Sequence, residues 1–179
     1  QYLIRQIYKA GPDDTILIHA AAGGMGTLLT QWAKHLGATV IGTVGSPEKA
    51  ALALENGCDH AIDYHAENFA ARVLEITDGA GVPAVYDGVG AAVYEGTVEC
   101  LAPCGFYVNY GHSSGFLPPL DAMMLNQKSL IFTKASLKDY MRDTAVANAM
   151  LAEVFELLAA GVLDPRISAE YALEDIAEA

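Results

Sequence analysis

Short apolar runs rich in β-branched residues alternate along the chain with longer stretches in which apolar residues recur every three or four positions. The runs predict six buried strands, at residues 15–20, 39–43, 60–63, 83–86, 105–110 and 130–133. The longer stretches predict the helices between and after them, at residues 27–36, 46–56, 67–77, 92–101, 121–127 and 144–160. Strand alternating with helix predicts an α/β fold, with a parallel sheet covered by helices on both faces.

The two ends of the chain do not follow this alternation. Residues 1–10 carry an apolar stripe and predict a linking helix that leads into the first strand. We predict one domain over residues 1–161, followed by a segment, 162–179, whose last helical stretch stops abruptly. Both ends look cut, so we expect an excised domain of a longer protein.

A glycine-rich turn follows the first predicted strand. The sequence from Thr15 to Gly26 reads TILIHAAAGGMG and leads into an amphipathic helix. Gly23 and Gly26 take the second and third places of a Gly-x-Gly-x-x-Gly pattern, and Ala21 takes the first. In a strand–turn–helix unit the second glycine lets a diphosphate approach the backbone, and the third lets the helix pack on the strand. A tight turn without a ligand is the alternative, but a second strand within one βαβ length favours a dinucleotide site.

This interpretation predicts a doubly wound Rossmann sheet with the strand order 3-2-1-4-5-6. An NAD site places an acidic residue about 20 positions beyond the glycine motif. Residues 43–47 (TVGSP) are instead small and uncharged. Lys49 lies one turn into the next helix, where its charge and the helix N-terminus suit the 2′-phosphate of NADPH. Glu48 argues mildly against this, and Lys49 could instead be a solvated surface lysine.

Composition narrows the function further. The chain has 179 residues, of which 53% are hydrophobic, and a formal net charge of −12. This acidity disfavours nucleic acids and anionic membranes as partners. No apolar run is long enough for a bilayer, and the first residues do not resemble a signal peptide, so we expect a cytoplasmic protein. The cysteines, Cys58, Cys100 and Cys104, lack the spacing of a disulfide framework or a zinc site, so we expect buried thiols and no metal.

With these residues placed, the sequence resembles the zinc-independent quinone oxidoreductases (the ζ-crystallin-like group) of the medium-chain dehydrogenase/reductase superfamily. The matching stretches are QYL at 1–3, HAAAGGMG at 19–26, QWAK at 31–34, IGTV at 41–44, IDY at 62–64, VYD at 85–87 with VG at 89–90, YGHSSG at 110–115, and LNQK at 125–128. The resemblance covers about half of a family member, chiefly the nucleotide-binding domain. It implies that residues 162–179 return to a GroES-like substrate domain that this chain lacks.

The resemblance implies hydride transfer from NADPH to a quinone without metal, with the protein supplying binding, orientation and shielding from water. It implies no catalytic residue in this chain, because the substrate-facing residues lie largely in the missing domain. It implies that Gly24 and Met25 contact the diphosphate, that Tyr64 contacts the 2′-phosphate, and that residues 111–114 and 135–137 lie near the nicotinamide. The implied cofactor-binding residues are Tyr2, Gly23, Gly24, Met25, Gly26, Gly45, Ser46, Lys49, Tyr64, Val89, Gly111, His112, Ser113, Ser114, Ala135, Ser136 and Leu137.

Three departures from the family pattern concern the nicotinamide end of the site. His112 stands where asparagine is frequent, Gly88 where serine is frequent, and Lys134–Ala135 where Arg-Pro is frequent. A histidine suits proton transfer near neutral pH. A cofactor-loop histidine that makes one hydrogen bond is the interpretation we favour for His112. Tyr64 has its own alternative, as a tyrosine of the core.

The resemblance also implies a homodimer that pairs through the edge strand Leu130 to Thr133. Such pairing would cover an apolar edge, although Lys128 and Lys134 at its ends could already protect it. Two other functions stay open: an enone or enoyl reductase of the same superfamily, and a nucleotide-binding or dimerisation module without turnover. The glycine turn and the cysteine spacing disfavour a zinc-dependent alcohol dehydrogenase.

Overall fold

A computed structural model describes residues 1–167 and 169–178 of the chain. Its six strands form a single sheet with the order β3-β2-β1-β4-β5-β6, and every neighbouring pair is parallel. The strands are β1 (Thr15–Ile18), β2 (Thr39–Val44), β3 (His60–Asp63), β4 (Val82–Asp87), β5 (Leu101–Asn109) and β6 (Ile131–Lys134). This arrangement confirms the predicted Rossmann order.

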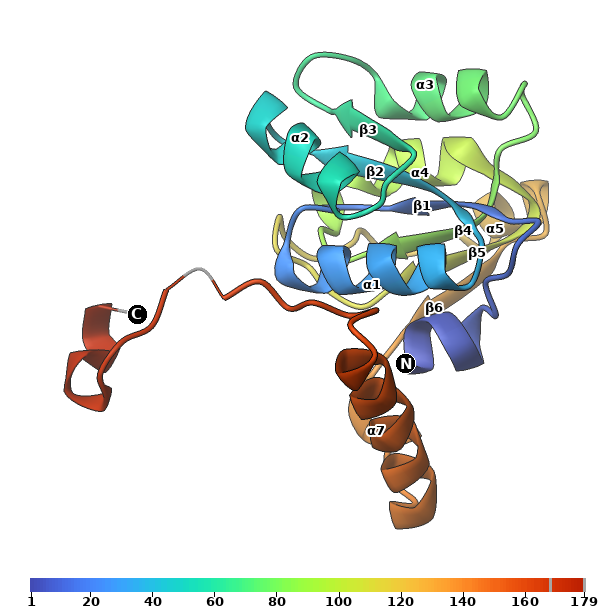
Figure 1. Cartoon of the computed structure of the whole chain (residues 1–179). Helices are drawn as coiled ribbons and strands as arrows, with labels where there is room; N and C mark the ends of the chain where they lie inside the picture. The colour runs from blue at the N-terminus through green and yellow to red at the C-terminus, as the bar shows by residue number, and fades with distance from the viewer. Residues whose placement is uncertain (168, 179) are drawn as a thin grey trace.

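Helices cover both faces of the sheet (Figure 1). On one face, α1 (Gly24–His35) and α2 (Pro47–Glu55) pack on a core that includes Ile16, Val40 and Ala84. On the other face, α3 (Phe69–Ile76), α4 (Tyr94–Cys100) and α5 (Ala122–Gln127) pack on a second core around Leu17, Ile41 and Val85. Successive residues of β1 and β2 therefore face opposite cores, as the alternation of side chains along a strand requires.

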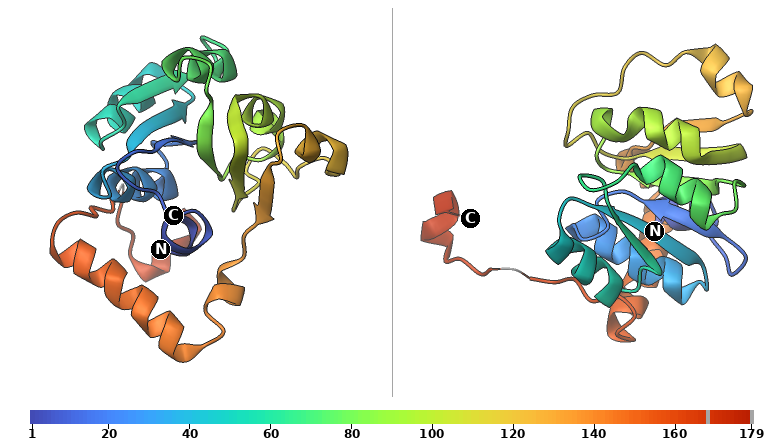
Figure 2. Two further views of the ribbon diagram at one scale, coloured as in Figure 1. Left: turned by 90° about the vertical axis from the view of Figure 1, so that its right-hand side faces the viewer. Right: turned by 90° about the horizontal axis from the view of Figure 1, so that it is seen from above.

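The N-terminal segment packs against α7 (Thr144–Ala159) at one side of the molecule (Figure 1). There α6 (Leu137–Tyr140) leads to α7, and Glu153 of α7 accepts hydrogen bonds from the side chains of Gln1 and Arg5, both at 2.8 Å. Leu163, just beyond α7, is buried in the core below α1. Asp164 still contacts α1 through Gln31, and residues 169–178 lie away from the sheet (Figure 2).

Several predicted elements differ from those found. Within residues 1–10 the helix is short: the π-helical turn Leu3–Ile7 follows Tyr2 and ends at Tyr8, which is extended and whose hydroxyl donates to Asp14 at 2.8 Å. The predicted helix at 92–101 is a 3-10 turn, Ala91–Val93, followed by α4. The four-residue helix α6 has no counterpart among the predictions. Within 162–179, Leu173–Glu178 forms 3-10 turns instead of an α-helix, and Ser168 and Ala179 lie outside the described residues.

The expectation that all three thiols are buried was wrong for Cys104. Cys58 and Cys100 are buried, but Cys104 is exposed. Strand β5 begins at Leu101, and its pairing with β4 shifts register between Val82 and Ala84, which face Leu101 and Phe106. The extra residues of β5 therefore bulge out of the sheet and carry Cys104, whose φ is 61°, to the surface.

Candidate dinucleotide-binding site

The turn between β1 and α1 depends on close backbone packing. Ala20 has a φ of 53°, and its carbonyl accepts a hydrogen bond from the N–H of Gly23 at 2.8 Å. A Cβ on Gly26 would lie 2.7 Å from the Cα of Ala21 and closer still to the carbonyl oxygen of Ala20. Only glycine lets α1 approach β1 this closely, which confirms the packing role predicted for Gly26.

The outer side of the same turn is open. At Gly24, the first residue of α1, a Cβ would meet nothing within 4 Å, and the side chain of Met25 is 49% exposed. The first N–H groups of an α-helix have no partner within the helix. Gly24 and Met25, both exposed, therefore present backbone donors to open space at the carboxyl end of β1. This is the geometry that binds a diphosphate at a helix N-terminus.

A buried histidine fixes the start of the turn. The Nδ1 of His19 lies 2.9 Å from the hydroxyl of Thr43, and its Nε2 lies 2.8 Å from the hydroxyl of Thr97. Because that Thr97 hydroxyl donates to the carbonyl of Val93, it accepts from Nε2–H, and Nδ1 accepts from Thr43. Burial lowers the pKa of His19 to about 4, so the ring is neutral at neutral pH. His19 joins β1, β2 and α4, a role that its place in the sequence did not indicate.

One cavity of about 130 Å³ brings together the residues predicted to distinguish NADPH from NADH. Its lining includes Gly23, Gly45, Lys49 and Tyr64. The hydroxyl of Ser46 accepts a hydrogen bond from the N–H of Lys49 at 3.3 Å and so caps α2. Tyr64 follows β3 and is 40% exposed, so it is no core tyrosine. The carboxyl ends of β1 and β3 and the starts of α1 and α2 meet at this cavity, because parallel strands end at the same edge of the sheet.

Glu48, directly before Lys49 in the sequence, carries the opposing charge. The hydroxyl of Ser46 hydrogen-bonds its carboxylate and lowers the pKa of Glu48 below its usual value. Glu48 is exposed at the start of α2, so water screens its charge.

A second cavity, of about 450 Å³, continues from the first and shares Ala20 and Tyr64 with it. Val89, Ser113 and Ser114 line it from the loops that follow β4 and β5. Ser114 ties the two loops together, since its hydroxyl donates to the carbonyl of Val89 at 2.8 Å and accepts from the N–H of Ala92 at 3.0 Å. The predicted residues at 89 and 113–114 therefore form one wall.

A buried carboxylate holds both of these loops. One oxygen of Asp87 accepts from the N–H groups of Val89 (2.7 Å) and Gly90 (2.9 Å). The other oxygen accepts from the hydroxyl of Tyr107 (2.8 Å) and the amide of Asn109 (2.7 Å). Asp87 is fully buried, and these four bonds use both oxygens. The backbone of the loop that begins the second cavity is thus fixed from within the sheet.

The same network extends to the edge strand. Asp87, Asn109 and Lys134 are register partners at the carboxyl ends of β4, β5 and β6. The ammonium of Lys134 donates to the side-chain oxygen of Asn109 and, at 3.1 Å, to the carbonyl of Gly111. Gly111 itself has no room for a side chain, because a Cβ there would lie 2.9 Å from the Cα of Gly88. Lys134 therefore positions the start of the loop at 111–115.

The remaining predicted residues lie at the far end of the same edge. Ala135 and Ser136 line a cavity of about 300 Å³ with Lys134 and Tyr140, and Leu137 begins α6 beside it, with 47% of its surface exposed. The ring of Tyr2 packs on that of Tyr140, with the ring centres 4.9 Å apart.

His112 is exposed and stacks on Phe116, with ring centres 4.5 Å apart and planes 18° apart. This stacking holds the ring against its own loop.

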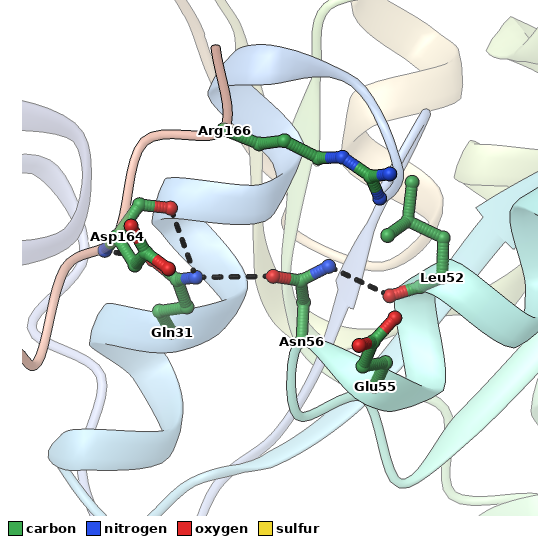
Figure 3. A pocket seen from close by; sticks show the side chains of 6 residues that line it. All are labelled: Gln31, Leu52, Glu55, Asn56, Asp164 and Arg166. Atoms are coloured by element: carbon green, nitrogen blue, oxygen red, sulfur yellow. Dashed lines mark hydrogen bonds between the residues drawn. The ribbon is translucent and has the colours of Figure 1, made fainter. Parts of the chain in front are cut away.

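A further cavity, of about 500 Å³, lies on the outer side of α1 and α2 (Figure 3). Gln31 of α1 donates to the side chain of Asn56 at 3.1 Å and accepts from the N–H of Asp164 at 2.9 Å. The cavity is lined by these three residues together with Leu52, Glu55 and Arg166. The segment after α7 is thus anchored to the two helices whose N-termini face the candidate site.

Residues 24–160 match the family model described as zinc-binding dehydrogenase. This match covers more than half of the chain. The chain belongs to the zinc-binding dehydrogenase family, within the medium-chain dehydrogenase/reductase superfamily. Within the described residues, no group of three or more His, Cys, Asp and Glu side chains is placed to hold a metal ion.

Relatives and solved structures match this chain over all or nearly all of its length. It is 45% identical over 180 residues to a quinone oxidoreductase of Pseudomonas aeruginosa, covering 100% of this chain and 55% of that protein. It is 41% identical over 181 residues to a 2-haloacrylate reductase of Burkholderia sp, covering 100% and 54%. A crystal structure of Escherichia coli quinone oxidoreductase complexed with NADPH matches with a TM-score of 0.87 and 41% identity, covering 97% of this chain and 52% of that one. The chain spans about half the length of the relatives it matches.

Among the described residues, no helix is long and apolar enough to cross a membrane.

The family match and the fold agree with the resemblance predicted from the sequence. The network of Asp87, Asn109 and Lys134 is what sequence reasoning missed. Its only signal in the sequence is that each of three apolar strands ends in a polar residue or is directly followed by one.

Proposed function

We propose that this chain is the NADPH-binding domain of a quinone oxidoreductase, which transfers hydride from NADPH to a quinone. The observation that carries the proposal is the cavity that joins Gly23 of the glycine turn to Lys49 and Tyr64. The diphosphate site at the glycine turn is then adjacent to a pocket that offers the Lys49 ammonium and the Tyr64 hydroxyl. An adenosine that carries a diphosphate and a 2′-phosphate requires this arrangement. The similarity to quinone oxidoreductases over the whole chain supports the same function.

The residues fit this cofactor from end to end. The open Cβ position at Gly24 and the N–H groups of the first turn of α1 would hold the diphosphate. Gly45, Ser46, Lys49 and Tyr64 would hold the adenosine ribose and its phosphate. When bound, NADPH would supply the hydride.

At the nicotinamide end, Val89, Ser113 and Ser114 would form one wall, and Ala135, Ser136 and Leu137 would lie beside Tyr2. His112 follows Gly111 on the same loop and would lie exposed beside the nicotinamide end of the site. The chain's own contribution is to bind and orient the ring, because Asp87 and Lys134 fix the backbone of the loops that would contact it. We assign no proton donor among these residues.

A second candidate function is the reduction of a conjugated double bond by the same hydride. The similarity to a 2-haloacrylate reductase favours it, since a 2-haloacrylate carries a carbon–carbon double bond beside its carboxylate. Both functions use the same cofactor site and differ in the substrate cleft. A third possibility, a nucleotide-binding module without turnover, would apply to this chain in isolation.

We further propose that two copies pair through β6 and that residues 1–161 are the cofactor domain, with 162–179 returning to a substrate domain. Strand β6 lies at the edge of the sheet, and Ile131 is 45% exposed. The ammonium of Lys128 donates to the carbonyls of Glu99 (2.7 Å) and Leu101 (2.8 Å), and that of Lys134 turns inward to Asn109. Neither lysine therefore blocks the edge by extending across it. Zinc independence and a cytoplasmic location stay predictions of the sequence.

The test is the effect of Lys49→Ala on the two cofactors. Removing this ammonium should weaken NADPH binding about tenfold, because a charge-assisted contact to the 2′-phosphate is lost, and should leave NADH binding within about twofold. Lys9→Ala is the matched control, since Lys9 is an exposed lysine that precedes β1 and is remote from the carboxyl edge of the sheet. Equal weakening of both cofactors by Lys49→Ala would contradict the proposed phosphate pocket.

A further inference from the structure

His65 is a second imidazole at the carboxyl edge of the sheet, and none of the residues assigned above includes it. It follows Tyr64 directly after β3, is exposed, and lines the cavity that continues from the Lys49 pocket. Tyr64 lines both cavities, with Lys49 in the lining of the first and His65 in the lining of the second. This placement puts three polar side chains from β3 and α2 around the loop that begins α2.

The polar atoms of Tyr64 and His65 converge on one point above Gly45. The hydroxyl of Tyr64 lies 2.6 Å, and the Nε2 of His65 3.7 Å, from the place that a Cβ on Gly45 would occupy. The two rings contact each other, with centres 4.5 Å apart and planes 59° apart. Gly45 has no side chain, so both atoms face its backbone, which leads to the N-terminus of α2.

Hydrogen bonds fix the backbone of Tyr64 and His65 and leave their rings available to a ligand. The N–H of Tyr64 donates to the carbonyl of Val44 at 3.2 Å, and the N–H of His65 donates to Oδ1 of Asp63 at 3.0 Å. In the part of the chain that the structure describes, no hydrogen bond engages the imidazole nitrogens. A phosphate at this point would meet the ammonium of Lys49, the hydroxyl of Tyr64, an imidazole N–H and the N-terminus of α2.

We propose that His65 is a specificity-determining residue for the 2′-phosphate of NADPH, with Nε2–H as a donor to that group. The proposal rests on the proposed function, since it takes the dinucleotide site as given. It adds a third side chain to the pair predicted from the sequence. The chemical class of the ligand is an adenosine that carries a phosphate on its 2′-oxygen, and the ribose with a free 2′-hydroxyl is the ligand it disfavours.

The experiment compares two fragments of the cofactors, 2′,5′-ADP and 5′-AMP, which differ only in the 2′-phosphate. Their dissociation constants are measured calorimetrically on this chain and on its His65→Phe variant, which keeps an aromatic ring against Tyr64 and removes both nitrogens. We expect about tenfold weaker binding of 2′,5′-ADP and less than a twofold change for 5′-AMP. His60→Phe is the matched control, because His60 begins the same strand at the opposite edge of the sheet.

A second variant keeps the proposal falsifiable if phenylalanine disturbs the fold. His65→Arg keeps a donor, and its guanidinium carries a fixed positive charge, so its preference for 2′,5′-ADP over 5′-AMP should equal or exceed that of the unchanged chain. Equal weakening of both fragments by His65→Phe would mean that the imidazole nitrogens do not distinguish the 2′-phosphate and would overturn the phosphate role of His65, as would no change. If the unchanged chain itself does not prefer 2′,5′-ADP, the proposed function fails first, and this inference fails with it.

Discussion

The buried carboxylate of Asp87 gives the sharpest test of how this site is built. Replacing it with asparagine keeps the shape and turns one acceptor oxygen into an NH₂ donor. All four present partners of Asp87 are donors, namely two backbone N–H groups, the hydroxyl of Tyr107 and the amide of Asn109. The Tyr107 hydroxyl can rotate to accept, but the amide of Asn109 cannot usefully flip, because its oxygen already accepts from Lys134.

The cost follows from this count. Whichever way the new amide is oriented, its NH₂ group meets at least one donor that has no other acceptor, in a site that water does not reach. Leaving one or two buried donors unsatisfied costs about 1–3 kcal/mol each, so we expect Asp87→Asn to lower the free energy of unfolding by about 2–4 kcal/mol. For a domain of this size each kcal/mol shifts the melting temperature by about 2–4 °C.

The assay is urea unfolding followed by circular dichroism, alongside calorimetric binding of NADPH. Asp121→Asn is the matched control, because Asp121 caps α5 by accepting from the N–H of Met123 at 2.8 Å, and asparagine caps a helix as well as aspartate does. Since the network holds the loops at 89–90 and 109–111, NADPH affinity should fall more than 2′,5′-ADP affinity. A change in stability no larger than that of Asp121→Asn would refute the reasoning.

Two further outcomes follow from the packing of the first turn. Because the pKa of His19 is lowered to about 4 in the folded chain, unfolding takes up a proton between about pH 4 and pH 6.5. The contribution of His19 to the free energy of unfolding, about 3 kcal/mol, is therefore complete above pH 6.5 and is lost as the pH falls to 4. An NMR titration in which the His19 ring protonates above pH 6 would contradict this. Gly26→Ala should destabilise the domain by about 1–3 kcal/mol, because its Cβ would overlap the backbone of Ala20 and Ala21, whereas Gly24→Ala has open space and should cost little; equal unfolding midpoints in urea would contradict the packing role of Gly26.

The fold was predictable because it depends on local patterns and a handedness rule. Alternating apolar runs and amphipathic stretches, with right-handed crossovers, leave few arrangements other than the observed sheet. The start of β5 was harder, because the sequence predicted a strand only from residue 105, whereas β5 begins at Leu101 and contains a bulge. Nothing local in the sequence marks this bulge, which places Cys104 at the surface.

The cofactor site was predictable where it depends on single segments. The glycine turn and the Ser46 cap with Lys49 each lie within one strand–helix connection, so their spacing carries the information. The Asp87–Asn109–Lys134 network depends on the register between three strands, which the sequence does not specify until the sheet is assembled. His65 was missed for the same reason, since only the fold brings β3 beside the start of α2.

The measurement that tests the central claim most directly is a calorimetric titration of this chain with NADPH and NADH at low and moderate salt. The account predicts tighter binding of NADPH, with a preference that shrinks as salt rises, because Lys49 and the N-terminus of α2 act on the 2′-phosphate through charge. Equal affinities, or tighter binding of NADH, would contradict the phosphate pocket formed by Lys49 and Tyr64. Binding of neither cofactor would contradict the claim that residues 1–161 hold a complete dinucleotide site.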